Sequence, residues 1–126
     1  MKYLRFTFLL FAFFEFLGAI RSFTSTPDSI NTRFGGSYMS PESMHFVFLF
    51  GAALLSIAIA AVFGFITKDR TARMGLCLSF ICYNGLATYA CYKGLSMTGS
   101  FQVGLTIHSV LLILFLILLG GLIRKT

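Results

Sequence analysis

Residues 44–66 read MHFVFLFGAALLSIAIAAVFGFI, without a single Asp, Glu, Lys or Arg. An α-helix needs about 20 apolar residues to cross the roughly 30 Å hydrocarbon core of a bilayer, so this stretch predicts a transmembrane helix. Three further apolar runs accompany it, at 6–20, 74–92 and 101–123. The sequence therefore predicts an all-α integral membrane protein, a multi-pass four-helix bundle.

The composition of the whole chain supports this environment. Hydrophobic residues make up 57% of the 126 residues and charged residues 11%, with a mean hydropathy of +0.87. Ordinary soluble domains are about half apolar and about a quarter charged. A domain of this size leaves roughly a third of its surface exposed, so water could not surround this much apolar surface. We expect one membrane domain over residues 1–126, with the lipid bilayer as its partner.

Local signals place the ends of the helices. Ser40 and Pro41 form an N-cap followed by a proline at the first helical position, Asp69 can cap the third helix, and Gly94 can end it. Thr26 can open a further short helix. The predicted elements are transmembrane helices at about 3–22, 41–66, 70–93 and 101–123, and an outer loop at 23–40.

The first apolar run has the basic start and short core of a signal peptide. Glu15 follows this core, where small residues should lead to a cleavage site. We therefore expect a retained helix.

The distribution of Lys and Arg predicts the orientation of the chain. Seven of the ten basic residues lie on one side of the predicted membrane: Lys2, Arg5, Lys68, Arg70, Arg73, Arg124 and Lys125. Arg21, Arg33 and Lys93 lie on the other side. Cytoplasmic loops carry the excess of positive charge, which predicts both termini on the cytoplasmic side, or the matrix or stromal side of an organelle. The basic residues form no stripe, so no nucleic-acid partner is expected.

Small residues four positions apart mark candidate helix-packing faces, since they let helix backbones approach closely in lipid. The second and third helices each carry such residues: Ala52, Ser56, Ala60, Gly64, Gly75 and Ser79. We expect these two helices to pack tightly against each other. The alternative is that the row forms an interface with another membrane protein or a second copy of the chain.

Polar groups inside membrane spans are functional candidates, because burying them in lipid is costly. Glu15, Asn84 and His108 are such groups on the first, third and fourth helices. Counting at about 1.5 Å per residue places all three about 10–12 Å below the outer surface. We expect His108 to be the donor that pairs with Glu15 and Asn84 to bridge them, with Tyr83 near enough in sequence to help.

This group has two interpretations. It can form a ligand or proton site that carries a proton, holds a cation or binds the polar head of an apolar ligand. It can also be structural, as hydrogen-bond links between helices or an interface with a partner protein. No metal-ligand spacing, phosphate loop or catalytic triad is present in the sequence, so no metal or cofactor is expected.

Three functions remain open. The first is a non-catalytic binding, accessory or assembly subunit of a membrane complex. The second is a small proton-coupled transporter or carrier of an apolar or cationic ligand that uses Glu15. The third is a lipid- or sterol-modifying enzyme with Glu15 and His108 as acid and base.

The chain resembles the small multidrug-resistance transporters in two respects, the helix count and an acid midway along the first helix. That resemblance implies Glu15 as the coupling residue. The chain departs from the family in having no tryptophan, a strong charge bias and a long first loop. The sequence does not assign it to that family.

Overall fold

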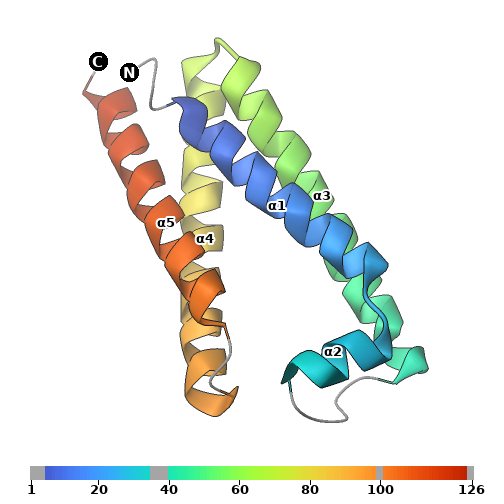
Figure 1. The fold of residues 1–126 in the computed structure, drawn as a ribbon. Coiled ribbons are helices and arrows are strands. Elements are labelled where there is room, and N and C mark those ends of the chain that lie inside the picture. The colour runs from blue at the N-terminus through green and yellow to red at the C-terminus, as the bar shows by residue number, and fades with distance from the viewer. Residues whose placement is uncertain (1–4, 35–39, 99–100, 125–126) are drawn as a thin grey trace.

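The regular structure in the described residues is entirely helical. The structure, a computed structural model, describes residues 5–34, 40–98 and 101–124. Four helices are long and apolar enough to cross a membrane: α1 (Phe6–Thr24), α3 (Met44–Ile66), α4 (Arg70–Thr98) and α5 (Gln102–Ile123) (Figure 1). A short helix α2 (Pro27–Phe34) and a 3₁₀ turn (Pro41–Ser43) connect α1 to α3. By length and composition, the chain is a multi-pass membrane protein.

Side-chain caps account for the helix starts. The Ser40 backbone N–H donates to the Ser43 hydroxyl at 3.0 Å, and the Thr71 N–H donates to the Asp69 carboxylate at 2.9 Å. Such bonds satisfy backbone donors that the first turn of a helix leaves unpaired. A 3₁₀ turn begins at Pro41 and leads into α3 at Met44, α4 begins at the predicted Arg70, and the short helix α2 follows Thr26. Residues 3–4 of the predicted first helix lie outside the described residues.

The predicted end of the third helix at Gly94 is wrong. Helix α4 continues to Thr98. A Cβ at Gly94 would lie 2.6 Å from the Phe101 ring, so this glycine allows the close approach of Phe101 rather than ending the helix. Phe101 itself has the left-handed φ of 72° that starts α5.

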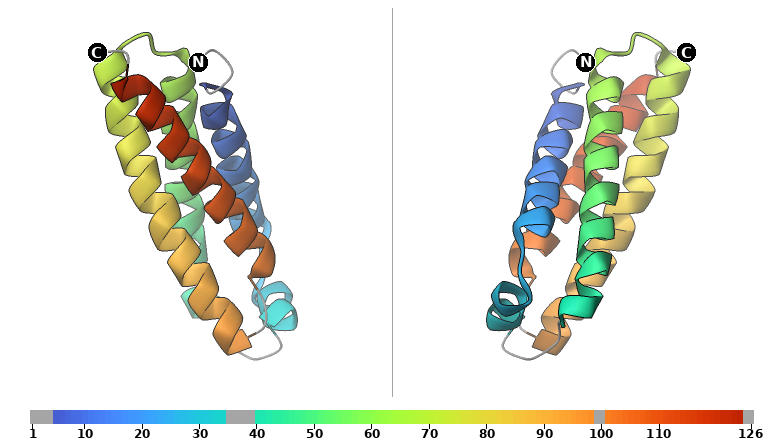
Figure 2. Two further views of the ribbon diagram at one scale, coloured as in Figure 1. Left: turned by 90° about the vertical axis from the view of Figure 1, so that its left-hand side faces the viewer. Right: turned by 90° about the vertical axis from the view of Figure 1, so that its right-hand side faces the viewer.

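The four long helices form two pairs, α1 with α3 and α4 with α5 (Figures 1 and 2). The pairs lie close together at the end where α1 begins and α5 ends, and diverge toward α2 (Figure 1). This corrects the expected tight contact between 41–66 and 70–93, because α3 packs mainly on α1.

The glycines of α3 explain the pairing. A Cβ at Gly64 would lie 2.5 Å from the Phe8 ring, and one at Gly51 would lie 2.8 Å from the Cβ of Ser22. Both contacts are to α1. Of the six predicted packing residues, Gly64 is buried and Ala60 is half-buried, whereas Ala52, Ser56, Gly75 and Ser79 are exposed.

An aromatic core joins the two pairs near their close end. Phe8 and Phe11 of α1 meet Phe80 of α4 and Phe115 of α5, with ring centroids 4.7–6.0 Å apart. Most of these pairs are edge-to-face, the arrangement that aromatic quadrupoles favour. The core fills only the half of the molecule nearest the start of α1.

Three arginines bind helix ends beyond this core. Arg5 donates to the carbonyl of Phe65, Arg70 to that of Leu122, and Arg73 to those of Gly64 and Thr67. The last carbonyls of a helix have no partner within it and carry the negative end of the helix dipole. The arginines therefore tie the ends of α3 and α5 to the rest of the molecule.

Large apolar side chains cover the outside of every long helix. Phe13, Ile59, Leu86 and Ile113 are each more than half exposed. A water-soluble monomer rarely exposes such continuous apolar surface. A lipid environment accounts for it.

Candidate functional site

Glu15 lies on the buried face of α1, directly beyond the aromatic core. Its side chain is 3% exposed. The Tyr83 hydroxyl of α4 donates a hydrogen bond of 2.9 Å to its Oε2 atom. This hydrogen bond joins the α1–α3 pair to the α4–α5 pair, and its donor is a neutral hydroxyl group.

Asn84 and His108 form a second link, within the α4–α5 pair. Asn84 is fully buried, and its Nδ2 atom donates to the Phe80 carbonyl at 2.8 Å. Its Oδ1 atom lies 2.9 Å from Nδ1 of His108. Because this amide oxygen can only accept, the Nδ1 atom of His108 carries the proton of this hydrogen bond.

The structure brings the three predicted site residues into one layer but changes their partners. The donor to Glu15 is Tyr83 rather than His108, and Asn84 bonds to His108 without bridging to Glu15. The Tyr83 ring stands between the two links, edge-on to the His108 ring with centroids 5.8 Å apart. Tyr83, which the sequence suggested only as an additional polar group, therefore lies at the centre of this layer.

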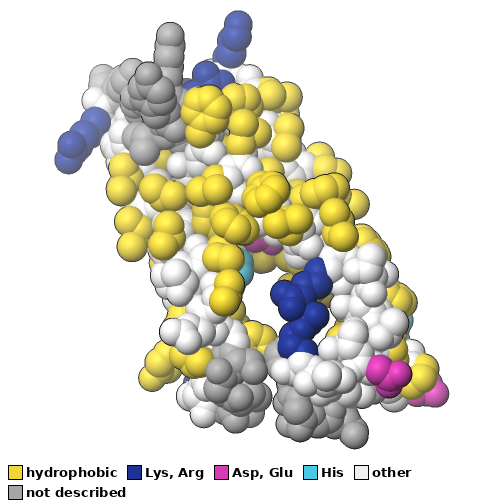
Figure 3. All heavy atoms as spheres, viewed as in Figure 1, with side chains coloured by type: hydrophobic (Ala, Val, Ile, Leu, Met, Phe, Trp, Pro, Cys, Tyr) yellow, Lys and Arg dark blue, Asp and Glu magenta, His cyan; other side chains and the backbone are white. Residues whose placement is uncertain are grey.

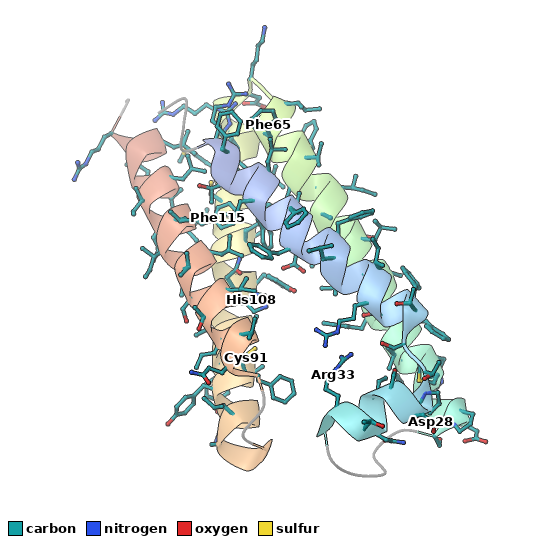
Figure 4. The ribbon with its side chains drawn as sticks, in the orientation of Figure 1. Asp28, Arg33, Phe65, Cys91, His108 and Phe115 are labelled. Carbon is teal, nitrogen blue, oxygen red and sulfur yellow. The ribbon has the colours of Figure 1, made fainter. Side chains whose placement is uncertain are left out.

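A cavity of about 890 Å³ opens beside this layer, between the diverging helix pairs. Glu15, Tyr83 and His108 line it at the level of the layer, together with apolar side chains of α1, α3 and α5. Figure 3 views the opening from one side, and His108 lies between Phe115 and Cys91 along α5 and α4 in Figure 4. The divergence of the helix pairs thus leaves the polar layer accessible.

Two arginines also line this cavity, Arg21 from α1 and Arg33 from α2. Basic atoms fill part of the opening in Figure 3, and the Arg33 side chain points into it in Figure 4. Neither arginine forms an ion pair with any acid in the described part of the chain. Partial burial lowers the pKa of the Arg33 guanidinium from its usual value, and the positive charge of Arg21 lowers that pKa further.

The sequence did not identify these arginines as site residues. It counted them only as charges on the outer side of the membrane. Their convergence depends on α2 folding back over the end of α1, and the local signal for a helix after Thr26 does not contain that packing. Reciprocal bonds between Thr26 and Ser29 at 2.9 and 3.2 Å form this cap.

The arrangement combines apolar walls, a polar layer and two positive charges. Within the described residues, no three His, Cys, Asp or Glu side chains come together as metal ligands would. The site can therefore hold an apolar body, bond to a polar group near His108 and attract an anion near the arginines. No family model matches the sequence, and neither a curated protein nor a solved structure shows detectable similarity to it.

Proposed function

We propose that this protein is a non-catalytic membrane protein that binds a ligand with an apolar body in the cavity between its helix pairs. The four long helices form a bundle in the bilayer, with both termini on the cytoplasmic side, or the matrix or stromal side of an organelle. Arg5, Arg70, Arg73 and Arg124 at one end and Arg21, Arg33 and Lys93 at the other support this orientation.

The cavity is the observation that carries the proposal. Small-molecule sites enclose about 300–1,000 Å³, with apolar walls and a few convergent polar groups. The volume of about 890 Å³ and the lining by Glu15, Tyr83 and His108 fit that description. A purely accessory or assembly subunit needs only its outer surface, so the cavity favours ligand binding over that role.

A matched pair of tryptophan variants on α5 tests the proposal. Ile107 lines the cavity, whereas Ile113 is 56% exposed on the outside of the same helix. We expect native mass spectrometry of the protein, extracted in mild detergent, to show one retained amphiphile per chain. Ile107→Trp should place a bulky ring in the cavity and reduce this adduct, and Ile113→Trp should keep it. Absence of an adduct from the wild type, or equal loss in both variants, would contradict the proposal.

A second candidate is proton-coupled transport with Glu15 as the coupling group. The observation that favours it is that Glu15 is 3% exposed and yet lines the cavity. Uptake of ethidium into vesicles under a pH gradient provides the test, with Glu15→Gln as the variant. Transport predicts that the variant loses uptake, and uptake equal to the wild type would eliminate this candidate.

A further inference from the structure

We propose that the ligand of this cavity is an anionic lipid, whose phosphate binds between Arg21 and Arg33 while an acyl chain occupies the apolar part of the cavity. The inference rests on the proposed binding function and specifies the chemistry of its ligand. It requires that the two arginines act together, that an anion suits them better than a cation, and that an apolar chain can follow the head group.

The two arginines meet the first requirement. They come from different helices, α1 and α2, and both line the same cavity. Two guanidinium groups without an acid partner repel each other, and an anion between them would remove that repulsion. Arginine presents a planar fork of donors that matches the oxygens of a phosphate, and such charge-assisted bonds are stronger than neutral ones.

The acids of the chain do not offset this positive charge. Glu15 is the acid that lines the cavity among the described residues, and Tyr83 already donates to it. It precedes Arg21 by six residues on α1, which separates the two by about 9 Å along the helix axis. An anion at the arginines therefore lies away from the carboxyl group, and a cation approaching from α2 meets two positive charges first.

The rest of the cavity suits a hydrocarbon chain. Phe14, Leu54, Val103 and Ile107 line it alongside the arginines and the polar layer. The opening between the helix pairs, visible in Figure 3, lets the remainder of a two-chain lipid stay in the bilayer. A soluble anion would gain nothing from these apolar walls, which favours a lipid as the source of the phosphate.

Native mass spectrometry of the full chain in mild detergent tests the inference with three probes: palmitoyl-oleoyl phosphatidic acid, the phosphatidylcholine with the same chains, and inorganic phosphate. We expect phosphatidic acid to bind at least about tenfold more tightly than phosphatidylcholine. Arg21→Gln and Arg33→Gln should each reduce this preference several-fold, and the double variant should abolish it. Lys93→Gln is the matched control, because Lys93 is an exposed cation of α4 that does not line the cavity.

Each arm of the experiment decides a separate point. Equal binding of the two lipids, with both lost in Ile107→Trp, would overturn the anion inference and leave the binding function standing. Absence of specific lipid binding would overturn the anionic-lipid inference, whereas the binding function is contradicted by absence of any retained amphiphile in the wild type. Inorganic phosphate binding as tightly as phosphatidic acid would assign the site to a soluble anion. An equal effect of Lys93→Gln would attribute the preference to general surface charge. Circular dichroism of each variant confirms that its helices are intact.

Discussion

At the scale of single residues, Tyr83 determines how a carboxyl group is accommodated inside the molecule. Its hydroxyl is the donor to Glu15, and its ring lies against His108. An unsatisfied buried polar group costs more than the net value of its hydrogen bond. Tyr83 therefore links the polar layer across the two helix pairs.

Tyr83→Phe tests this link. The variant leaves Glu15 buried without its donor, so we expect the free energy of unfolding to fall by about 1 kcal/mol. Unfolding in mixed micelles with increasing sodium dodecyl sulfate, followed by circular dichroism, measures the change. Tyr89→Phe is the control, since Tyr89 is 60% exposed on the same helix. Similar losses in the two variants would show that the Glu15 bond contributes nothing of its own.

The residue scale also shows what the sequence could and could not predict about the site. Counting residues along each helix placed Glu15, Asn84 and His108 at one depth, because the rise of an α-helix is fixed. The partner of Glu15 depends on how α1 is rotated relative to α4, and the sequence does not contain that angle. Arg21 contributed only to the distribution of Lys and Arg that predicts orientation. That distribution indicates the side of the membrane on which a residue lies, but not the direction in which its side chain points.

At the scale of elements, the pairing of α1 with α3 depends on where α3 lacks side chains. Gly64 faces the ring of Phe8, which is fully buried. Small residues occur on several faces of α3, including Ala52, Ser56 and Ala58. The pattern of small residues alone therefore could not select the partner helix, whereas the caps at Ser40 and Asp69 act within one turn and could be predicted.

Gly64→Ala and Gly75→Ala form a matched test of this packing. The added methyl group at Gly64 must displace Phe8, so we expect the free energy of unfolding to fall by about 1–3 kcal/mol. A Cβ at Gly75 meets nothing within 4 Å, so alanine there should leave stability unchanged or raise it by up to about 1 kcal/mol. The same detergent titration measures both variants. Greater loss for Gly75→Ala than for Gly64→Ala would reverse the assignment of the interface.

At the scale of the whole molecule, the aromatic core and the cavity occupy opposite ends of the long helices. The aromatic core lies toward the start of α1, and the cavity lies toward α2. The basic residues are also unequally divided, with the larger group at the end that holds the core. The proposed orientation follows from this asymmetry, since the more positive end stays on the cytoplasmic side.

Cysteine labelling of intact cells tests this orientation. Asp28 on α2 and Lys68 between α3 and α4 are both exposed. Each is changed to Cys, one at a time, in a variant in which Ser replaces Cys82 and Cys91. Cys77 is fully buried. An impermeant maleimide should label the Asp28→Cys protein in intact cells and the Lys68→Cys protein only after permeabilisation. The opposite pattern would place the cavity on the other side of the membrane.

The arginine bonds at the ends of α3 and α5 have a consequence for how a ligand is exchanged. Arg73 of α4 donates to the carbonyls of Gly64 and Thr67 at the end of α3, so it fastens one helix pair to the other where they meet, and rocking of the pairs widens or narrows only the far end. The close end then behaves as a hinge, and the aromatic core beside it closes the route through the protein. A guest should therefore arrive and depart sideways, through the leaflet that surrounds the wide end of the molecule, without passing across the bilayer.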